Sequence, residues 1–179
     1  AQEKLEASGE RTSTLRRHAS YFARHCDELG RALYGSNGPA NLRALGREID
    51  NLLGVNRDAC TLGRDDVEWI VDALRVTVAL YPVFLARGPV STYVEMLTLV
   101  LERAESLDAD RTLRARALAY AAYFANADPE PASRLADATN DLSTRIDVLL
   151  VRAAVRSRRS QLDDATSDYL RVLELARAC

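Results

Sequence analysis

The sequence predicts an all-α fold, an α-α superhelix of about four antiparallel helical hairpins. Apolar residues recur at spacings of three and four along most of the chain, which is the period of an amphipathic helix. No stretch alternates apolar and polar residues over the length of a strand. The 179 residues include only 8 Gly and 5 Pro, so there are few places at which a strand could turn.

Turn signals divide the chain into eight predicted helices, and the clearest is Gly-Ser-Asn-Gly-Pro at 35–39. Short turns between helices of similar length favour pairing into antiparallel hairpins. Residues 1–11 are predicted to be a polar linker, and residues 12–179 to form one helical repeat domain. The helices are expected over about 12–34, from the 35–39 turn to Gly63, 65–86, 91–106, 111–126, from the 128–131 turn to Leu142, 144–159 and 162–178.

The helix over 65–86 is apolar on most of its sides. A helix with this pattern is typically a central, buried one. Pro82 lies inside it and is expected to kink it, because proline lacks the backbone donor of the helical hydrogen bond.

The last helix is expected to turn five residues inward: Leu162, Ala165, Tyr169, Val172 and Ala176. Other apolar residues, Leu170, Leu173 and Leu175, crowd the same helix. A helical repeat array needs a polar terminal helix for solubility. We therefore expect either that the sequence is a fragment of a longer protein or that the chain associates with itself through this helix.

Composition argues against several classes of protein. The net charge is −2 and the pI about 5.8, without the basic balance that is typical of a nucleic-acid-binding domain. Three cysteines, Cys26, Cys60 and Cys179, without CxxC spacing predict neither a disulfide framework nor a zinc site, but two buried thiols and one at the terminus. Neither a signal peptide nor an uninterrupted run of about 18 apolar residues is present, so we expect a cytoplasmic protein without a membrane span.

No catalytic motif is recognisable, and we expect neither an enzyme, nor a metal, nor a cofactor. The sequence has no G-x-x-x-x-G-K-[ST] and no H-E-x-x-H. The only histidines, His18 and His25, lie seven residues apart, roughly 10 Å along a helix, which is too far to share one zinc ion. Most aspartates, including Asp66, Asp110 and Asp128, lie at turns or helix starts, where they are expected to cap backbone donors.

The run of Arg152, Arg156, Arg158 and Arg159 is the strongest cluster of charge. A module that binds nucleic acid through this cluster is the alternative function. Such a site needs stacking aromatic residues among the basic ones, and none interleaves here. Ion pairing with the acidic faces of the sixth and eighth helices is the more ordinary role for these arginines.

A repeat is visible near the C-terminus. Ala132 and Ala165 are 33 residues apart, close to the tetratricopeptide period of about 34. Each lies early in the second helix of its hairpin, where a small residue lets two helices approach. Tyr93 takes the corresponding place in the preceding hairpin, 39 residues before Ala132. The segment 155–176 resembles a tetratricopeptide repeat, with Leu162, Ala165, Tyr169 and Leu175 in motif places, but with Ala153 and Arg156 where Gly and Tyr are usual.

A second resemblance covers residues 15–105. The octapeptide LRRHASYF (15–22), the G-x-x-G-P turn and the pattern L-x-x-L-x-x-E-x-D-N-L ending at Leu52 resemble one helical region of large multidomain bacterial signal-transduction ATPases. That region follows their ATPase and winged-helix modules, and the family includes transcriptional regulators and regulators tied to protein kinases. The resemblance implies a protein-interaction or sensor module in such a regulator.

The tetratricopeptide resemblance also implies a binding surface, because the first helix of each hairpin lines the concave side of such arrays. Small and apolar residues with three arginines around them would suit a protein or peptide segment with apolar anchors and carboxylates. The alternative is that these arginines pair with Asp72, Asp147 or other local acids. The expected lining residues are Arg75, Val78 and Leu85 of the third helix, Arg114, Ala121 and Ala125 of the fifth, and Leu150, Ala154 and Arg158 of the seventh.

Overall fold

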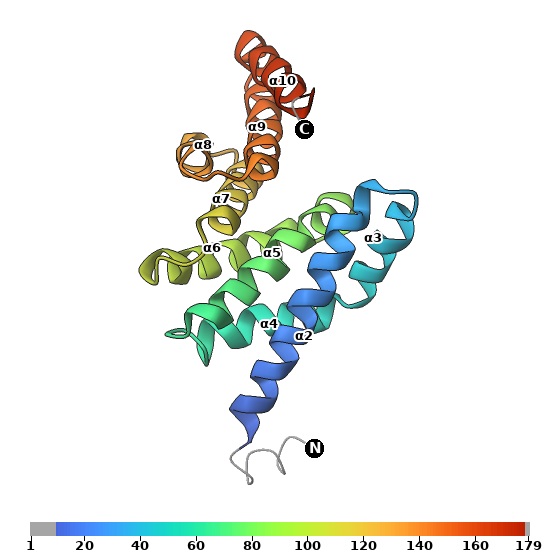
Figure 1. Cartoon of the computed structure of the whole chain (residues 1–179), viewed down its shortest axis with the longest axis vertical. Helices are drawn as coiled ribbons and strands as arrows, with labels where there is room; N and C mark the ends of the chain where they lie inside the picture. Colours follow the sequence, from blue (N-terminus) through green and yellow to red (C-terminus); the bar gives the residue numbers. More distant parts are fainter. Residues whose placement is uncertain (1–9, 178–179) are drawn as a thin grey trace. The chain divides into compact units, whose positions relative to one another are not determined.

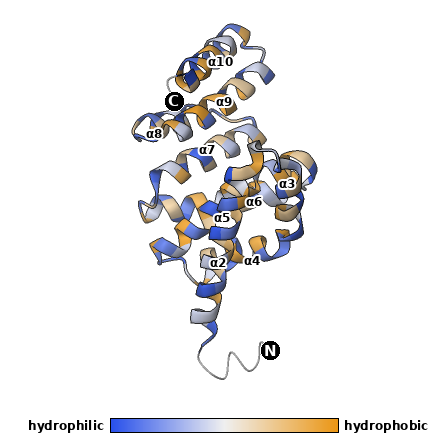
Figure 2. Cartoon of the chain, turned by 45° about the vertical axis from the view of Figure 1, so that its right-hand side comes forward, coloured by the Kyte–Doolittle hydropathy of each residue, from blue (hydrophilic) through white to orange (hydrophobic). Residues whose placement is uncertain are grey.

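The structure is a computed structural model that describes residues 10–177 (Figure 1). These residues form nine α-helices and one short 3-10 helix, and no strand, which confirms the predicted all-α fold. Hydrophobic and hydrophilic residues lie side by side along the helices (Figure 2), as expected where amphipathic helices pack together. The chain divides into two compact units, unit 1 (Ala1–Ala109) and unit 2 (Asp110–Cys179).

Unit 1 is built around α5, which packs against α2, α3, α4 and α6. The predicted central helix is therefore confirmed, and its buried residues include Trp69, Ile70, Leu74 and Leu80. Its elements are α2 (Arg11–Arg31), η1 (Ala32–Tyr34), α3 (Gly38–Arg47), α4 (Ile49–Thr61), α5 (Val67–Arg87) and α6 (Val90–Ser106).

The helix α5 continues through Pro82 to Arg87. By length and composition it is the one helix among residues 10–177 that could cross a membrane. However, 61% of its apolar stretch is buried inside the protein. This burial is what the core helix of a folded unit shows.

One predicted helix is two helices in the structure. The stretch expected to run without interruption to Gly63 breaks at Glu48, between α3 and α4. The Glu48 N–H reaches both Ala44 O, at 3.3 Å, and Leu45 O, at 3.2 Å, which tightens the end of α3. The Glu48 side chain then accepts a hydrogen bond of 2.8 Å from Asn51 in the first turn of α4. The prediction of one uninterrupted helix is therefore wrong, because the apolar spacing in the sequence continues across the break.

Three buried polar residues join α4, α5 and α6. Asn56 Nδ2 donates to Thr77 Oγ1 at 2.9 Å, and Tyr93 Oη donates to Thr77 O at 2.7 Å. The Tyr93 ring stacks on Phe84 with a centroid distance of 4.7 Å. Tyr93 therefore fills, with a buried aromatic ring, the place that Ala132 and Ala165 occupy in later hairpins, and this position is a packing position.

Unit 2 consists of two helical hairpins, α7 (Arg111–Ala125) with α8 (Glu130–Asp137), and α9 (Leu142–Arg158) with α10 (Leu162–Arg177). The first helices of the two hairpins, α7 and α9, pack against each other, and α8 also packs on α9. Ala132 and Ala165 are 1% and 3% exposed, so both small residues lie at helix contacts as the repeat predicted.

Aspartates begin several helices, as the sequence predicted. Asp66 accepts a hydrogen bond from the backbone of Trp69 at 3.1 Å, and Asp110 accepts one from Leu113 at 3.0 Å. Asp141 accepts one from Thr144 at 3.0 Å and starts α9. The helix α8 ends at Asp137, five residues before the predicted end at Leu142, because the chain turns there to place Asp141 as the cap of α9.

The predicted inward face of α10 is wrong in part. Ala165 and Val172 are buried, but Leu162 and Tyr169 are 62% and 42% exposed, and Ala176 is also exposed. The third buried residue is Asp168, at 4% exposure. Because Asp168 forms ion pairs with α9, α10 is rotated so that the stripe 165, 168, 172 faces inward, and Leu162 and Tyr169 lie at its edge.

Candidate functional site

The expected lining residues fall in both units. Arg75, Val78 and Leu85 lie on α5 of unit 1, where Leu85 is 49% exposed and Val78 is half-buried. Arg75 Nη1 donates to Asp72 Oδ1 at 2.8 Å, so this arginine forms the local pair that the alternative interpretation predicted. The remaining expected residues belong to unit 2.

In unit 2 the expected residues lie on two adjacent helices. Arg114, Ala121 and Ala125 are on α7, Leu150, Ala154 and Arg158 are on α9, and the two helices pack against each other. None of the six is buried: Leu150 is 41% exposed, Ala125 and Arg158 are exposed, and the other three are half-buried. We call these six residues the α7–α9 face. The small alanine side chains and Leu150 make this face apolar. One arginine lies on each helix, Arg114 on α7 and Arg158 on α9.

Two arginines at the end of α9 are bound to the end of α7. Arg158 Nη1 donates to Tyr123 O at 2.9 Å, and its guanidinium lies 4.7 Å from the centre of the Tyr123 ring. Arg159 donates to the backbone and side-chain oxygens of Asn126, whose φ of 50° ends α7 in the left-handed region. Cations at a helix C-terminus are favourable because they meet the unpaired carbonyls and the negative end of the helix dipole.

The other two arginines of the basic run are held in a partly buried ion cluster around Asp168. Arg152 donates to Asp168 through Nε at 3.0 Å and through Nη2 at 2.6 Å. Arg156 Nη1 donates to the same carboxylate at 2.9 Å, and its Nη2 donates to Glu130 at 2.8 Å. The run therefore pairs with acids of α8 and α10, as the more ordinary interpretation predicted, and it does not present four arginines to solvent.

A polar contact that the sequence did not indicate links α7 to α9. Tyr120 Oη donates to Asp147 Oδ2 at 2.5 Å, and Arg116 Nε lies 3.5 Å from the same oxygen. Burial raises the pKa of Asp147 above its usual value, against the lowering effects of Tyr120 and Arg116. Asp147 is therefore paired with Arg116 and Tyr120. Tyr120 lies 27 positions away in the sequence, so helical spacing cannot assign this partner.

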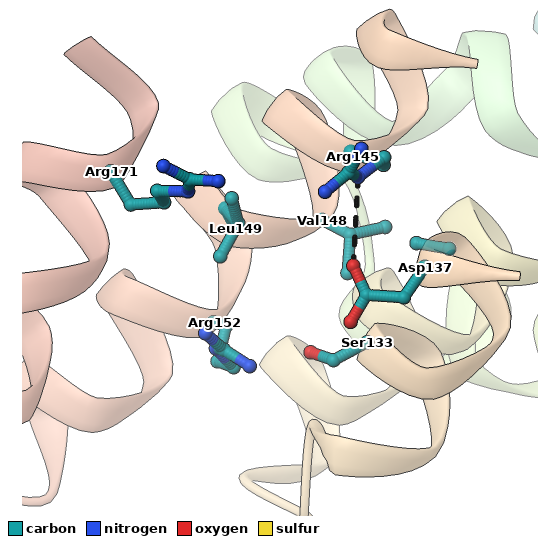
Figure 3. Close-up of a pocket in the computed structure, with 8 residues that line it drawn as sticks. Ser133, Asp137, Arg145, Val148, Leu149, Arg152 and Arg171 are labelled. Atoms are coloured by element: carbon teal, nitrogen blue, oxygen red, sulfur yellow. Dashed lines mark ion pairs between the residues drawn. The ribbon is translucent and has the colours of Figure 1, made fainter. Parts of the chain in front are cut away.

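A pocket of about 180 Å³ opens between α8, α9 and α10 (Figure 3). Figure 3 shows Arg171 and Leu149 on one side of it and Asp137 and Ser133 on the other. The only ion pair drawn across the pocket joins Arg145 Nε to Asp137 Oδ1 at 3.5 Å. Its lining residues are Ser133, Ala136, Asp137, Arg145, Val148, Leu149, Arg152 and Arg171.

The cysteines and histidines are in packing positions. Burial raises the pKa of the Cys26 thiol to about 12 and that of Cys60 to about 11, so both stay protonated at neutral pH. This confirms the two predicted buried thiols, while Cys179 lies outside the described residues. His18 packs on the ring of Phe22, and His25 stacks on Tyr21. Within residues 10–177, no group of three or more His, Cys, Asp or Glu side chains could hold a metal ion.

Comparisons of the chain with protein-family models, with curated proteins and with solved structures give no match.

Proposed function

We propose that this chain is a protein-interaction module, not an enzyme, and that unit 2 binds a segment of a partner protein on the α7–α9 face. The observation that carries the proposal is the accessibility of Leu150 and Ala154 on α9 beside Ala121 on α7. Large apolar side chains that are left exposed next to small ones suit an apolar anchor of a bound segment.

The charges of this face favour an acidic segment. Arg114 lies in the first turn of α7, and Arg158 is the last residue of α9. Among residues 10–177, Arg158 donates a hydrogen bond through Nη1 alone, to Tyr123 O, so we propose that its second terminal nitrogen and its Nε bind the ligand. A guanidinium binds a carboxylate through two parallel hydrogen bonds, so acidic residues near an apolar anchor would be recognised.

The resemblance of residues 15–105 supports a place for this module in a large cytoplasmic bacterial regulator of transcription or of protein-kinase signalling. Stacked helical hairpins suit such a role because they present extended surfaces to partners. The proposal for the α7–α9 face uses residues of unit 2 alone, and Arg75, Val78 and Leu85 of unit 1 are proposed as further partner-binding residues.

Little of the positive charge that the nucleic-acid alternative requires is available to bind phosphate groups. Of the cluster from Arg152 to Arg159, Arg152 and Arg156 are engaged by Asp168 and Glu130. Arg158 and Arg159 are exposed, but both contact the end of α7. A patch of two exposed arginines is small for a site that depends on many phosphate contacts.

The test is affinity capture from a bacterial lysate, with and without nuclease, followed by binding measurements with the captured partner. The double variant Arg114→Glu with Arg158→Glu should abolish binding. The matched control, Arg134→Glu with Arg177→Glu, changes the same charge at exposed positions of α8 and α10 and should leave binding unchanged. Leu150→Glu is the second variant, because Arg158→Glu also removes a contact to α7. Equal losses from the two arginine pairs, or capture that nuclease abolishes, would contradict the proposal.

A further inference from the structure

The pocket between α8, α9 and α10 lies on a different side of α9 from the α7–α9 face. Its α9 residues are Arg145, Val148, Leu149 and Arg152, which repeat at spacings of three and four. Leu150, Ala154 and Arg158 repeat at four, and with 3.6 residues per turn they fall roughly opposite the first set. The two places on unit 2 can therefore be tested independently.

The three arginines of the pocket differ in how far their donors are used. Arg152 donates to Asp168 through Nε and Nη2, and Arg171 Nη1 donates to Glu174 at 2.7 Å. Arg145 is different: its Nε is buried and has no hydrogen-bond partner in the described part of the chain. Its nearest carboxylate oxygen, on Asp137, is 3.5 Å away.

A buried donor of a charged group without a hydrogen bond is unfavourable, and an acceptor delivered by a ligand would satisfy it. The guanidinium of Arg145 lines the pocket together with that of Arg171, as Figure 3 shows. We propose that this pocket binds a carboxylate group, held by Arg145 and Arg171, whose attached short aliphatic chain packs on Val148, Leu149 and Ala136.

Charge and size select the class of ligand. Asp137 is part of the lining, and Asp168 and Glu174 already neutralise Arg152 and Arg171. With Asp137 paired to Arg145, the three arginines and three carboxylates at the pocket balance in charge, so the pocket suits a ligand with one carboxylate and not a nucleotide triphosphate. A volume of about 180 Å³ is below the roughly 300–1,000 Å³ of pockets for larger ligands, so a short aliphatic monocarboxylic acid or one acidic side chain fits.

The carboxylate can come from a free small acid or from an acidic residue of a protein. The experiment is calorimetric titration of the full chain with butyrate, with a blocked Glu-Leu dipeptide, and with inorganic phosphate. Saturable binding of butyrate identifies a free acid as a ligand. Binding of the dipeptide alone identifies an acidic side chain of a protein. Either result supports the proposal, provided that phosphate binds more weakly.

The variants locate the site. Arg145→Gln should weaken binding roughly tenfold or more, since a hydrogen bond between charged groups is lost. Arg145→Lys keeps the charge but loses the planar fork, so it should give an intermediate loss. Arg134→Gln is the matched control, because Arg134 is an exposed arginine of α8 that does not line the pocket.

Circular dichroism and thermal melting check that each variant keeps its fold. Three results would overturn the proposal: no saturable binding of either acid up to tens of millimolar, equal binding of phosphate, or equal losses from Arg145→Gln and Arg134→Gln. Leu150→Glu should leave this binding unchanged, which separates the pocket from the proposed partner-binding face.

Discussion

Arg152 of α9 holds the buried carboxylate of Asp168 of α10 by two hydrogen bonds, of 3.0 Å and 2.6 Å. The side chain of Asp168 is 5% exposed and that of Arg152 is 18% exposed, so this pair is largely removed from solvent. Arg156 binds the same carboxylate and extends the cluster to Glu130 of α8. One acid therefore ties the second hairpin of unit 2 to itself and, through Arg156, to the first hairpin.

Replacing Asp168 with Ala should destabilise the protein by about 3–5 kcal/mol, because it leaves two partly buried guanidinium groups without their partner. Chemical denaturation followed by circular dichroism measures the loss. Glu174→Ala is the control on the same helix, since its pair with Arg171 is exposed and should contribute less than about 1 kcal/mol. Similar losses from both variants would contradict the role of the cluster.

Replacing Tyr93 with Phe should cost about 1–2 kcal/mol, because the hydroxyl donates a buried hydrogen bond of 2.7 Å to Thr77 O. The ring stacking on Phe84 is retained, so the variant isolates the hydroxyl. Tyr21→Phe serves as the reference, since Tyr21 is 56% exposed, and it should leave the melting temperature unchanged. A melting temperature for Tyr93→Phe equal to wild type would show that the hydrogen bond contributes nothing.

Asp147 should make stability depend on pH. Burial raises its pKa in the folded protein, so its contribution to stability is fully present below the unfolded pKa and is lost as pH rises through the folded pKa. Asp147→Asn should therefore gain stability relative to wild type as pH rises from 3 to 7. Melting temperatures of both proteins across this range test the sign. A variant whose melting temperature falls relative to that of wild type as pH rises would be the opposite result.

The outer side of α10 should mediate self-association. Leu162, Leu170 and Leu173 are 62%, 56% and 51% exposed on one helix. The helix begins with Asp163 and Asp164 and ends with Arg177, so an antiparallel pair of copies would place acid against base. Light scattering after size-exclusion chromatography should show a dimer that Leu170→Glu with Leu173→Glu dissociates. Leu99→Glu, an exposed leucine of α6, should leave it intact, and a monomeric wild type would refute the expectation.

Periodicity predicted the helices and the burial of α5, because both depend on where apolar residues recur along one helix. It did not predict the break at Glu48, since backbone closure there leaves the apolar spacing unchanged. The burial of Asp168 was also not predicted, because in the sequence alone an aspartate is expected to be exposed to solvent unless its arginine partners are known. Those partners lie 12 and 16 residues away on another helix.

The sequence predicted the parts of the candidate site that depend on spacing along one helix, but not those that depend on how helices meet. The accessible positions of α7 and α9 follow from helical spacing and the repeat pattern. The pocket around Arg145 does not, because it depends on the early end of α8 at Asp137 and on how three helices meet. The ion pair of Arg75 with Asp72 was predicted as an alternative, since the two lie three residues apart on one helix.

The burial of α5 also determines how the backbone should exchange its amide protons. Four helices, α2, α3, α4 and α6, pack on α5, so the amides of its central turns, around Leu74 to Leu80, can meet deuterated solvent only when unit 1 opens extensively. The helix α10 packs mainly against α9. The leucines on its outer side are exposed to solvent. Its amides should exchange through local fraying, long before those of α5, so deuterium uptake would reveal opening at one end of the described chain while the middle of unit 1 stays closed.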